Sequence, residues 1–319
     1  MGRRSREKRE RRERGEIEPK EEREEGITPI LVGIIRWATY LISFTPLIIS
    51  GEYFFPFVGP KSIFFMGLVE IIFFTWLLLI VFNQKYRPRL NILLTVLILF
   101  LVVLILSSYF GADISRSFWS KYERMTGLLM WFHLLAFFVV LTSVFRENID
   151  WLKIFGVSIF AAILMSLISV FVKVSPGAVG SMLAASRGGA TIGNSSFMGT
   201  YLLFNVFLAL YLFFKTAGGL KIYSGISLAI ISIALFLSDA RAAILSLLGG
   251  LVLLLLLWLI FCKKGFLKFA GIFLLIIFAI GVFGLMYFSS QPGSFVYQKF
   301  VQMASKSRLV VWGMAGKDF

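Results

Sequence analysis

The sequence predicts an all-α membrane protein, a polytopic bundle of about nine transmembrane helices. Three observations predict it: 58% of the 319 residues are hydrophobic, only 15% are charged, and the apolar residues gather in long uninterrupted stretches. Soluble domains carry about 25% charged residues. A chain whose solvent is hydrocarbon excludes charge, because lipid cannot solvate it.

The charges are concentrated at the start of the chain. The first 26 residues hold ten of the 32 Lys and Arg residues and nine of the 17 Asp and Glu residues. Interleaved Arg and Glu residues are typical of a solvated helix or of a disordered segment. We therefore expect residues 1–28 to form a charged cytoplasmic tail. No cleavage site of small residues is visible, so we expect no cleaved signal peptide here.

Nine apolar stretches are long enough to span a bilayer, which takes roughly 20 residues of helix. Together they form a predicted transmembrane domain over residues 29–288. Residues 289–319 follow as the start of a large extracytoplasmic loop. The predicted spans are residues 29–50, 61–82, 91–110, 125–145, 152–172, 197–214, 220–237, 242–262 and 267–288.

The basic residues between the spans predict the orientation. With the tail inside, four short inner connections hold ten Lys and Arg residues, whereas seven on the outer side are spread over longer stretches. This density favours a cytoplasmic N-terminus. Positive charge outside the membrane is disfavoured by the same rule, so the outer cations need another reason. Anionic ligand groups supply one.

Several functional classes are disfavoured by composition. The chain has one cysteine, Cys262, and one histidine, His133, so a zinc site of His and Cys ligands is excluded. The formal net charge is +15, but the basic residues lie in short loops rather than on one soluble face, so we expect no nucleic-acid partner. Glu70 and His133 lie within spans, where we expect hydrogen bonds inside the bundle, and Arg36 is expected to snorkel.

Four predicted outer segments each carry an arginine, the residue suited to forked hydrogen bonds with phosphate oxygens. One such arginine at a span boundary is explained by lipid headgroups. Four on one side of the membrane favour a larger anionic ligand. The segments are residues 121–129, 186–202, 237–244 and 307–315, with Arg124, Arg187, Arg241 and Arg308 respectively.

These segments resemble motifs of the O-antigen ligase and O-antigen polymerase family of bacterial envelope glycosyltransferases. Residues 187–202 are similar to its Arg, Gly/Thr, Gly-Asn and Tyr-Leu pattern, with a Ser-Ser pair in place of Pro-Asn. Residues 239–243 resemble its Ser-Arg-Gly-Ala hairpin, and residues 123–128 its Glu-Arg-x-x-Gly-Leu motif. Residues 305–312 approximate its Ser-x-Arg-Leu-x-x-Trp motif.

The resemblance implies an activity and a site. The expected reaction transfers a glycan from undecaprenyl pyrophosphate to an acceptor on the outer face of the bacterial plasma membrane, without a metal or another cofactor. The acceptor is a glycolipid sugar, another glycan or a protein hydroxyl. Arg241 and Arg308 are the first candidates to bind the pyrophosphate, followed by Arg187 and Arg124. Asn194 is expected to position its loop or a sugar hydroxyl.

The chemistry agrees with arginine at this site. As the glycosidic bond breaks, negative charge grows on the bridging oxygen of the pyrophosphate, and fixed guanidinium groups stabilise it. The resemblance also implies a basic histidine in the large outer loop, whereas His133 lies within a predicted span. We therefore expect that residues 1–319 alone do not turn over substrate and that the family's catalytic histidine lies beyond Phe319.

Two interpretations from other classes stay open. A transporter or flippase for a lipid-linked or anionic solute would show inverted repeats and broken helices that meet at the midplane. A non-enzymatic membrane scaffold would keep its function without the outer arginines. For the transferase, the expected partners are a lipid-linked oligosaccharide donor, one of the acceptors above and membrane lipid.

Overall fold

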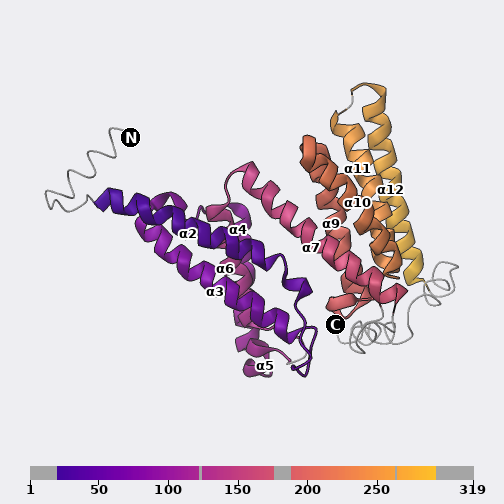
Figure 1. Cartoon of the computed structure of the whole chain (residues 1–319). Coiled ribbons are helices and arrows are strands. Elements are labelled where there is room, and N and C mark those ends of the chain that lie inside the picture. The colour runs from indigo at the N-terminus through magenta and orange to yellow at the C-terminus, as the bar shows by residue number, and fades with distance from the viewer. Residues whose placement is uncertain (1–19, 122–123, 176–187, 263, 292–319) are drawn as a thin grey trace. The chain divides into compact units, whose positions relative to one another are not determined.

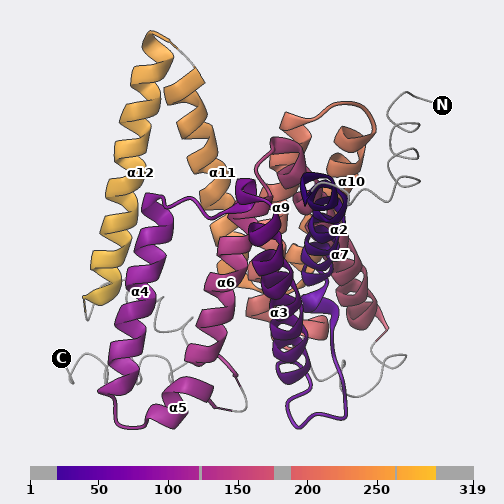
Figure 2. The ribbon, with the colours of Figure 1, turned by 90° about the vertical axis from the view of Figure 1, so that its left-hand side faces the viewer.

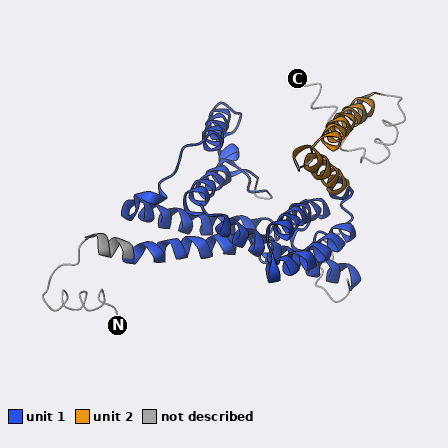
Figure 3. Cartoon of the chain, turned by 90° about the horizontal axis from the view of Figure 1, so that it is seen from above, with its two compact units in different colours: residues 1–244 blue, residues 245–319 orange. Residues whose placement is uncertain are grey.

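A computed structural model describes residues 20–121, 124–175, 188–262 and 264–291. These residues form ten α-helices, three short 3-10 helices and no β-strand, which confirms the all-α fold class. The chain divides into two compact units, residues 1–244 and 245–319, drawn in different colours in Figure 3. Each unit is described by itself below.

Unit 1 contains seven long helices, one short helix and the first residues of α11, which continues into unit 2; the helices are labelled in Figure 1. The helices are α2 (Lys20–Ile42), α3 (Gly59–Phe82), α4 (Ile92–Tyr109), α5 (Ile114–Trp119), α6 (Leu128–Val144), α7 (Asn148–Val174), α9 (Ser195–Lys215), α10 (Gly218–Leu237) and α11 (Arg241–Cys262), and the 3-10 helices are η1 (Thr45–Leu47), η2 (Gln84–Tyr86) and η4 (Ala190–Ile192).

All nine predicted spans fall on helices, and eight of them match the observed bounds within four residues. Seven helices of the described chain are long and apolar enough to cross a membrane. Two further apolar helices, Gly26–Ile42 and Leu128–Val144, are shorter. The protein is therefore a multi-pass helical membrane protein.

The prediction of the first span was wrong at its end. We expected a helix to residue 50, but α2 ends at Ile42. Pro46 has no N–H to donate to the Ile42 carbonyl four residues earlier. The Thr45 hydroxyl donates to that carbonyl instead, over 2.7 Å. The helix therefore stops and residues 43–58 form an irregular connection. At its start, α2 reaches back to Lys20, so part of the predicted tail is helical.

Apolar side chains of α2, α3 and α6 form one core of unit 1, and α6 stands between α3 and α4 in Figure 2. Long aliphatic and aromatic residues recur every three to four positions on each helix, so one stripe is buried while the others face outward. The buried members are Leu31, Val32, Ile35, Ala38, Ile72, Trp76, Leu79, Val140, Val144 and Phe145.

Polar contacts join α7, α9 and α10 elsewhere in unit 1. Ser158 donates a hydrogen bond of 2.9 Å to the Asn205 side chain, whose amide donates to the Tyr201 carbonyl at 3.0 Å. The Tyr223 hydroxyl donates to the Gly156 carbonyl at 2.9 Å. Such bonds between helices stabilise membrane bundles, where apolar burial contributes little to helix association.

Consecutive long helices of unit 1 run in opposite directions, so their connections gather at two ends. We call the site end the one that holds residues 43–58, 110–127, 188–194 and 238–240. The opposite end holds residues 83–91, 145–147 and 216–217, which include Lys85, Arg87, Arg89 and Arg146 of the expected inner cations. Lys61 contacts residues 48 and 191 at the site end, and Arg146 contacts residue 87 at the opposite end.

At the opposite end, charged groups are paired or crowded. Arg36 was expected to snorkel, but its guanidinium pairs with the buried carboxylate of Asp150 at 2.9 Å. Arg146 donates to the Arg87 carbonyl at 2.9 Å. Burial, and then the nearby positive charge of Arg89, lower the pKa of Arg146. This end therefore concentrates positive charge, as the sequence predicted for an inner face.

Unit 2 contains the rest of α11 and α12 (Phe266–Ser290). Gly271 allows α12 to approach α11 closely, because a Cβ there would lie 2.9 Å from the Cβ of Leu259. Most of the remaining aliphatic and aromatic side chains of the two helices are exposed within the unit. Since both helices have the length and composition of membrane spans, these side chains are suited to hydrocarbon.

Candidate functional site

The candidate site lies at the site end of unit 1. Of the five residues singled out from the sequence, the structure describes Arg124, Asn194 and Arg241. Arg187 and Arg308 lie outside the described residues. The contacts below show which of the predicted segments the fold brings together.

Lys61 ties two connections of the site end together. Its ammonium group donates to the carbonyls of Ile48 at 2.7 Å, Phe57 at 2.9 Å and Thr191 at 2.6 Å. In return, the Thr191 hydroxyl donates to the Pro46 carbonyl at 2.8 Å. An ammonium has three donors, and here all three are used. Lys61, which the sequence marked only as an outer cation, is a structural residue.

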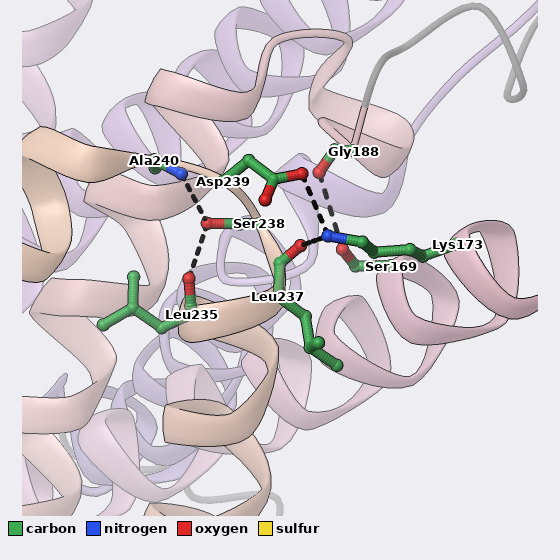
Figure 4. A network of polar contacts seen from close by, with 8 residues as sticks. All are labelled: Ser169, Lys173, Gly188, Leu235, Leu237, Ser238, Asp239 and Ala240. Atoms are coloured by element: carbon green, nitrogen blue, oxygen red, sulfur yellow. Dashed lines mark hydrogen bonds and ion pairs between the residues drawn. The ribbon is translucent and has the colours of Figure 1, made fainter.

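Lys173 performs the same role for the hairpin between α10 and α11, as Figure 4 shows. Its ammonium donates to the Leu237 carbonyl at 2.6 Å and pairs with the Asp239 carboxylate at 2.9 Å. On the same helix, the Ser169 hydroxyl donates to the Gly188 carbonyl at 3.5 Å. The end of α7 therefore holds both residues 237–239 and residue 188.

Asn194 is the N-cap of α9. Its side-chain oxygen accepts hydrogen bonds from the backbone N–H groups of Ser196 at 2.9 Å and Phe197 at 3.4 Å. Just before it, Gly193 has φ +79°, and a Cβ there would overlap the ring of Phe57. Asn194 thus fixes the direction in which α9 leaves the loop, which is one of the two roles expected of it.

Small residues bring two of the family-like segments into contact. A Cβ on Gly199 would lie only 2.3 Å from the Cβ of Ala240 and 3.0 Å from that of Ala243. The start of α9 therefore packs directly on the start of α11. At these three positions, small residues serve close helix packing.

Among the described residues, non-glycine residues with a positive φ occur only at the site end. Non-glycine residues rarely adopt a positive φ, which costs roughly 1–2 kcal/mol. Such strain is found preferentially at functional sites. The described chain has four of these residues, all in site-end connections: Ser120 (φ 67°), Met125 (φ 48°), Ala190 (φ 45°) and Asp239 (φ 58°).

Arg124 lines a basic cavity of about 420 Å³ together with Arg116, Ser120 and Lys121. The short helix α5 shapes it, with Asp113 accepting a hydrogen bond of 2.9 Å from the Arg116 N–H as its N-cap. Among the described residues, three cations and no carboxylate line the cavity, so it suits an anion. The sequence predicted a site role for Arg124 alone, although the close spacing of Arg116 and Lys121 was visible in it.

Arg241 is the first residue of α11, and its side chain is exposed. No hydrogen bond or ion pair to another described residue engages its guanidinium, unlike the ammonium groups of Lys61 and Lys173. A helix N-terminus also favours negative charge, through the helix dipole and its unpaired N–H groups. Arg241 is therefore free to bind an anionic group from outside the chain.

The fold thus joins the segments of Asn194 and Arg241 but does not link the Arg124 cavity to them. In the described residues, no hydrogen bond or ion pair connects residues 116–124 to residues 188–194 or 238–241. No histidine takes part in the contacts described at the site end. His133 lies in α6, where it contacts Leu129 and Glu70.

A scan of protein-family models finds no match to this chain, and searches of curated proteins and of solved structures find none. No three His, Cys, Asp or Glu side chains in the described ranges are placed to hold a metal ion. The class of the protein therefore rests on its own helices, and they make it a multi-pass membrane protein.

Proposed function

We propose that the protein is a glycosyltransferase of the O-antigen ligase and polymerase type. In this proposal it binds a glycan carried on undecaprenyl pyrophosphate at the site end of unit 1, and the glycan is transferred there to an acceptor hydroxyl. The site end then faces the outside of the bacterial plasma membrane, and the opposite end, with Arg87, Arg89 and Arg146, faces the cytoplasm.

One observation carries the proposal. The segments around Asn194 and Arg241 resemble two motifs of that family, and they are packed against each other through Gly199, Ala240 and Ala243. If the resemblance of the two segments to the family motifs were a coincidence, there would be no reason for the segments to lie side by side in the fold. The positive φ of Ala190 and Asp239 in the same connections supports it further, as does the basic cavity elsewhere at the site end.

In the proposed reaction, the acceptor hydroxyl attacks the anomeric carbon and the bond to the pyrophosphate oxygen breaks. The departing pyrophosphate gains negative charge, which the guanidinium of Arg241 stabilises through charge-assisted hydrogen bonds. The cations of the Arg124 cavity contribute positive potential at the same membrane face. Lys61 and Lys173 hold the connections in place, because their ammonium groups are engaged by carbonyls and by Asp239.

Binding of the lipid carrier tests the proposal without requiring turnover. The full chain in lipid nanodiscs is titrated with undecaprenyl pyrophosphate and, separately, with undecaprenol, which lacks the phosphates. We expect Arg241→Ala and Arg124→Ala each to weaken binding of the pyrophosphate by about tenfold, as loss of a charge-assisted hydrogen bond requires. Binding of undecaprenol should not change.

Arg89→Ala is the matched control, because Arg89 is exposed at the opposite end. Equal loss in Arg89→Ala and Arg241→Ala would contradict a site at the site end. Equal affinity for undecaprenol and its pyrophosphate would contradict the proposed ligand. A second assay follows a labelled lipid-linked glycan in membranes that contain the protein. Movement across the bilayer without transfer would identify a flippase instead.

A further inference from the structure

The pair Glu70 and His133 lies apart from the site end. Glu70 is the twelfth of the 24 residues of α3, so it sits midway along a membrane span. His133 belongs to α6, which packs beside α3 (Figure 2). The His133 Nε2 atom is 3.3 Å from the Glu70 Oε1 atom.

The other ring nitrogen of His133 fixes where the protons are. Nδ1 lies 2.8 Å from the carbonyl oxygen of Leu129. A carbonyl oxygen only accepts hydrogen bonds, so Nδ1 must carry a hydrogen. A neutral imidazole then has a lone pair on Nε2, and an ionised carboxylate also only accepts. The contact between Nε2 and Oε1 therefore needs a second proton, on the ring or on the carboxyl group.

The surroundings also require that proton. The Glu70 side chain is 59% exposed, on a face that it shares with apolar residues such as Ile71 and Phe74, whereas that of His133 is 13% exposed. We had expected Glu70 to be bonded inside the bundle, but it is bonded on an outward face. An ionised carboxylate without a partner is costly at this depth in a membrane. One proton on the pair makes its net charge zero.

Among the described residues, no charge other than His133 lies within ion-pair distance of Glu70. Two cations of the neighbouring elements are engaged elsewhere: Arg36 by Asp150, and Lys61 by three carbonyls. Among the side chains that the structure describes, the other titratable groups on α3 and on the elements packed against α3 and α6 are Arg36 and Tyr40 on α2, Lys61 on α3, Tyr109 on α4, Arg116 on α5, and Lys85 and Tyr86 on η2. Residues 20–25 at the start of α2 carry further charges.

We propose that Glu70 and His133 form a proton-binding site within the membrane, which holds one proton between Oε1 and Nε2. Binding adds a proton to the pair and changes no other bond. The site neutralises the carboxylate of α3 and adds a hydrogen bond between α3 and α6 only while the proton is bound. It is independent of the proposed glycan transfer.

The single histidine of the chain makes the test direct, because ¹⁵N-labelled histidine marks only His133. The full chain in lipid bilayers is titrated between about pH 5 and pH 9 while the signals of both ring nitrogens are followed by solid-state NMR. We expect Nδ1 to stay protonated throughout. We expect Nε2 to carry a proton or to share one with Oε1 of Glu70.

In Glu70→Gln the shared proton has no carboxylate oxygen to bind, so we expect the Nε2 signal to differ from that of wild type. Glu147→Gln, which removes an exposed carboxylate at the opposite end, should leave the Nε2 signal unchanged. Equal Nε2 signals in wild type and Glu70→Gln would overturn the proposal. If Glu70→Gln does not fold, the wild-type titration decides: an Nε2 signal of a free neutral nitrogen at every pH contradicts it.

Discussion

The two ends of unit 1 are held together by different means. At the opposite end, the buried carboxylate of Asp150 pairs with the partly exposed guanidinium of Arg36 beside an apolar core that includes Trp76 and Phe145. At the site end, Lys61 and Lys173 bind backbone carbonyls of the connections, and four residues have a positive φ. The comparison shows that lysines, rather than arginines, hold the connections of the site end in place. The exposed arginines of that end are therefore available to a ligand.

The largest expected effect is at the site end. Lys61→Met removes three hydrogen bonds and leaves the carbonyls of Ile48, Phe57 and Thr191 without that partner. We expect the free energy of unfolding to fall by about 3 kcal/mol, since unsatisfied polar groups are costly. Unfolding in mixed detergent micelles, followed by circular dichroism, measures it. Lys153→Met is the control, and similar losses in both variants would refute the structural role of Lys61.

Loss of a carboxylate should cost more stability at the opposite end than at the site end. The Asp150 side chain is 4% exposed, whereas that of Asp239 is 77% exposed. We expect Asp150→Asn to cost about 2 kcal/mol, because it leaves Arg36 without its buried counterion. Asp239→Asn should cost less than about 0.5 kcal/mol, because exposed pairs contribute little and Asn tolerates a positive φ. The same unfolding measurement applies, and the reverse order would break the comparison.

The smallest effect concerns the contact between α9 and α11. Gly199→Ala adds a Cβ that would lie 2.3 Å from the Cβ of Ala240. The overlap costs about 1–3 kcal/mol, of which the better helix propensity of alanine offsets about 1 kcal/mol. Gly67→Ala, where no atom lies within 4 Å of the added Cβ, should instead stabilise α3. A gain of stability in both variants would show that the α9–α11 contact is loose.

The sequence predicted most of the helices because the apolar stretches are long and their separators carry charge or proline. It placed α3, α9 and α10 within two residues at each end. The sequence prediction failed at the end of α2. Residues 47–49 are as apolar as the helix before them, so apolarity did not mark the end. The effect of Pro46 depends on which backbone carbonyl loses its hydrogen-bond donor. Apolarity alone does not show where a helix ends.

The candidate site was less predictable. The arginines were visible as outer cations, and Asn194 as part of a motif. The roles of Lys61 and Lys173 were not visible, because their acceptors are backbone carbonyls far away in the sequence, such as that of Thr191. The pairing of Glu70 with His133 spans 63 positions, and nothing in either local sequence indicates it. The resemblance to a glycosyltransferase family stays a prediction.

The short helix α6 has a consequence for the bilayer itself. Its 17 residues span about 26 Å, which is less than a hydrocarbon core of about 30 Å, whereas the neighbouring α3 has 24 residues. Thinning of the lipid beside α6 would relieve the mismatch. The connection that leads into α6, with Arg116, Lys121 and Arg124, would then lie close to the depth of the lipid phosphates. A lipid-borne anion would reach these cations without leaving its leaflet.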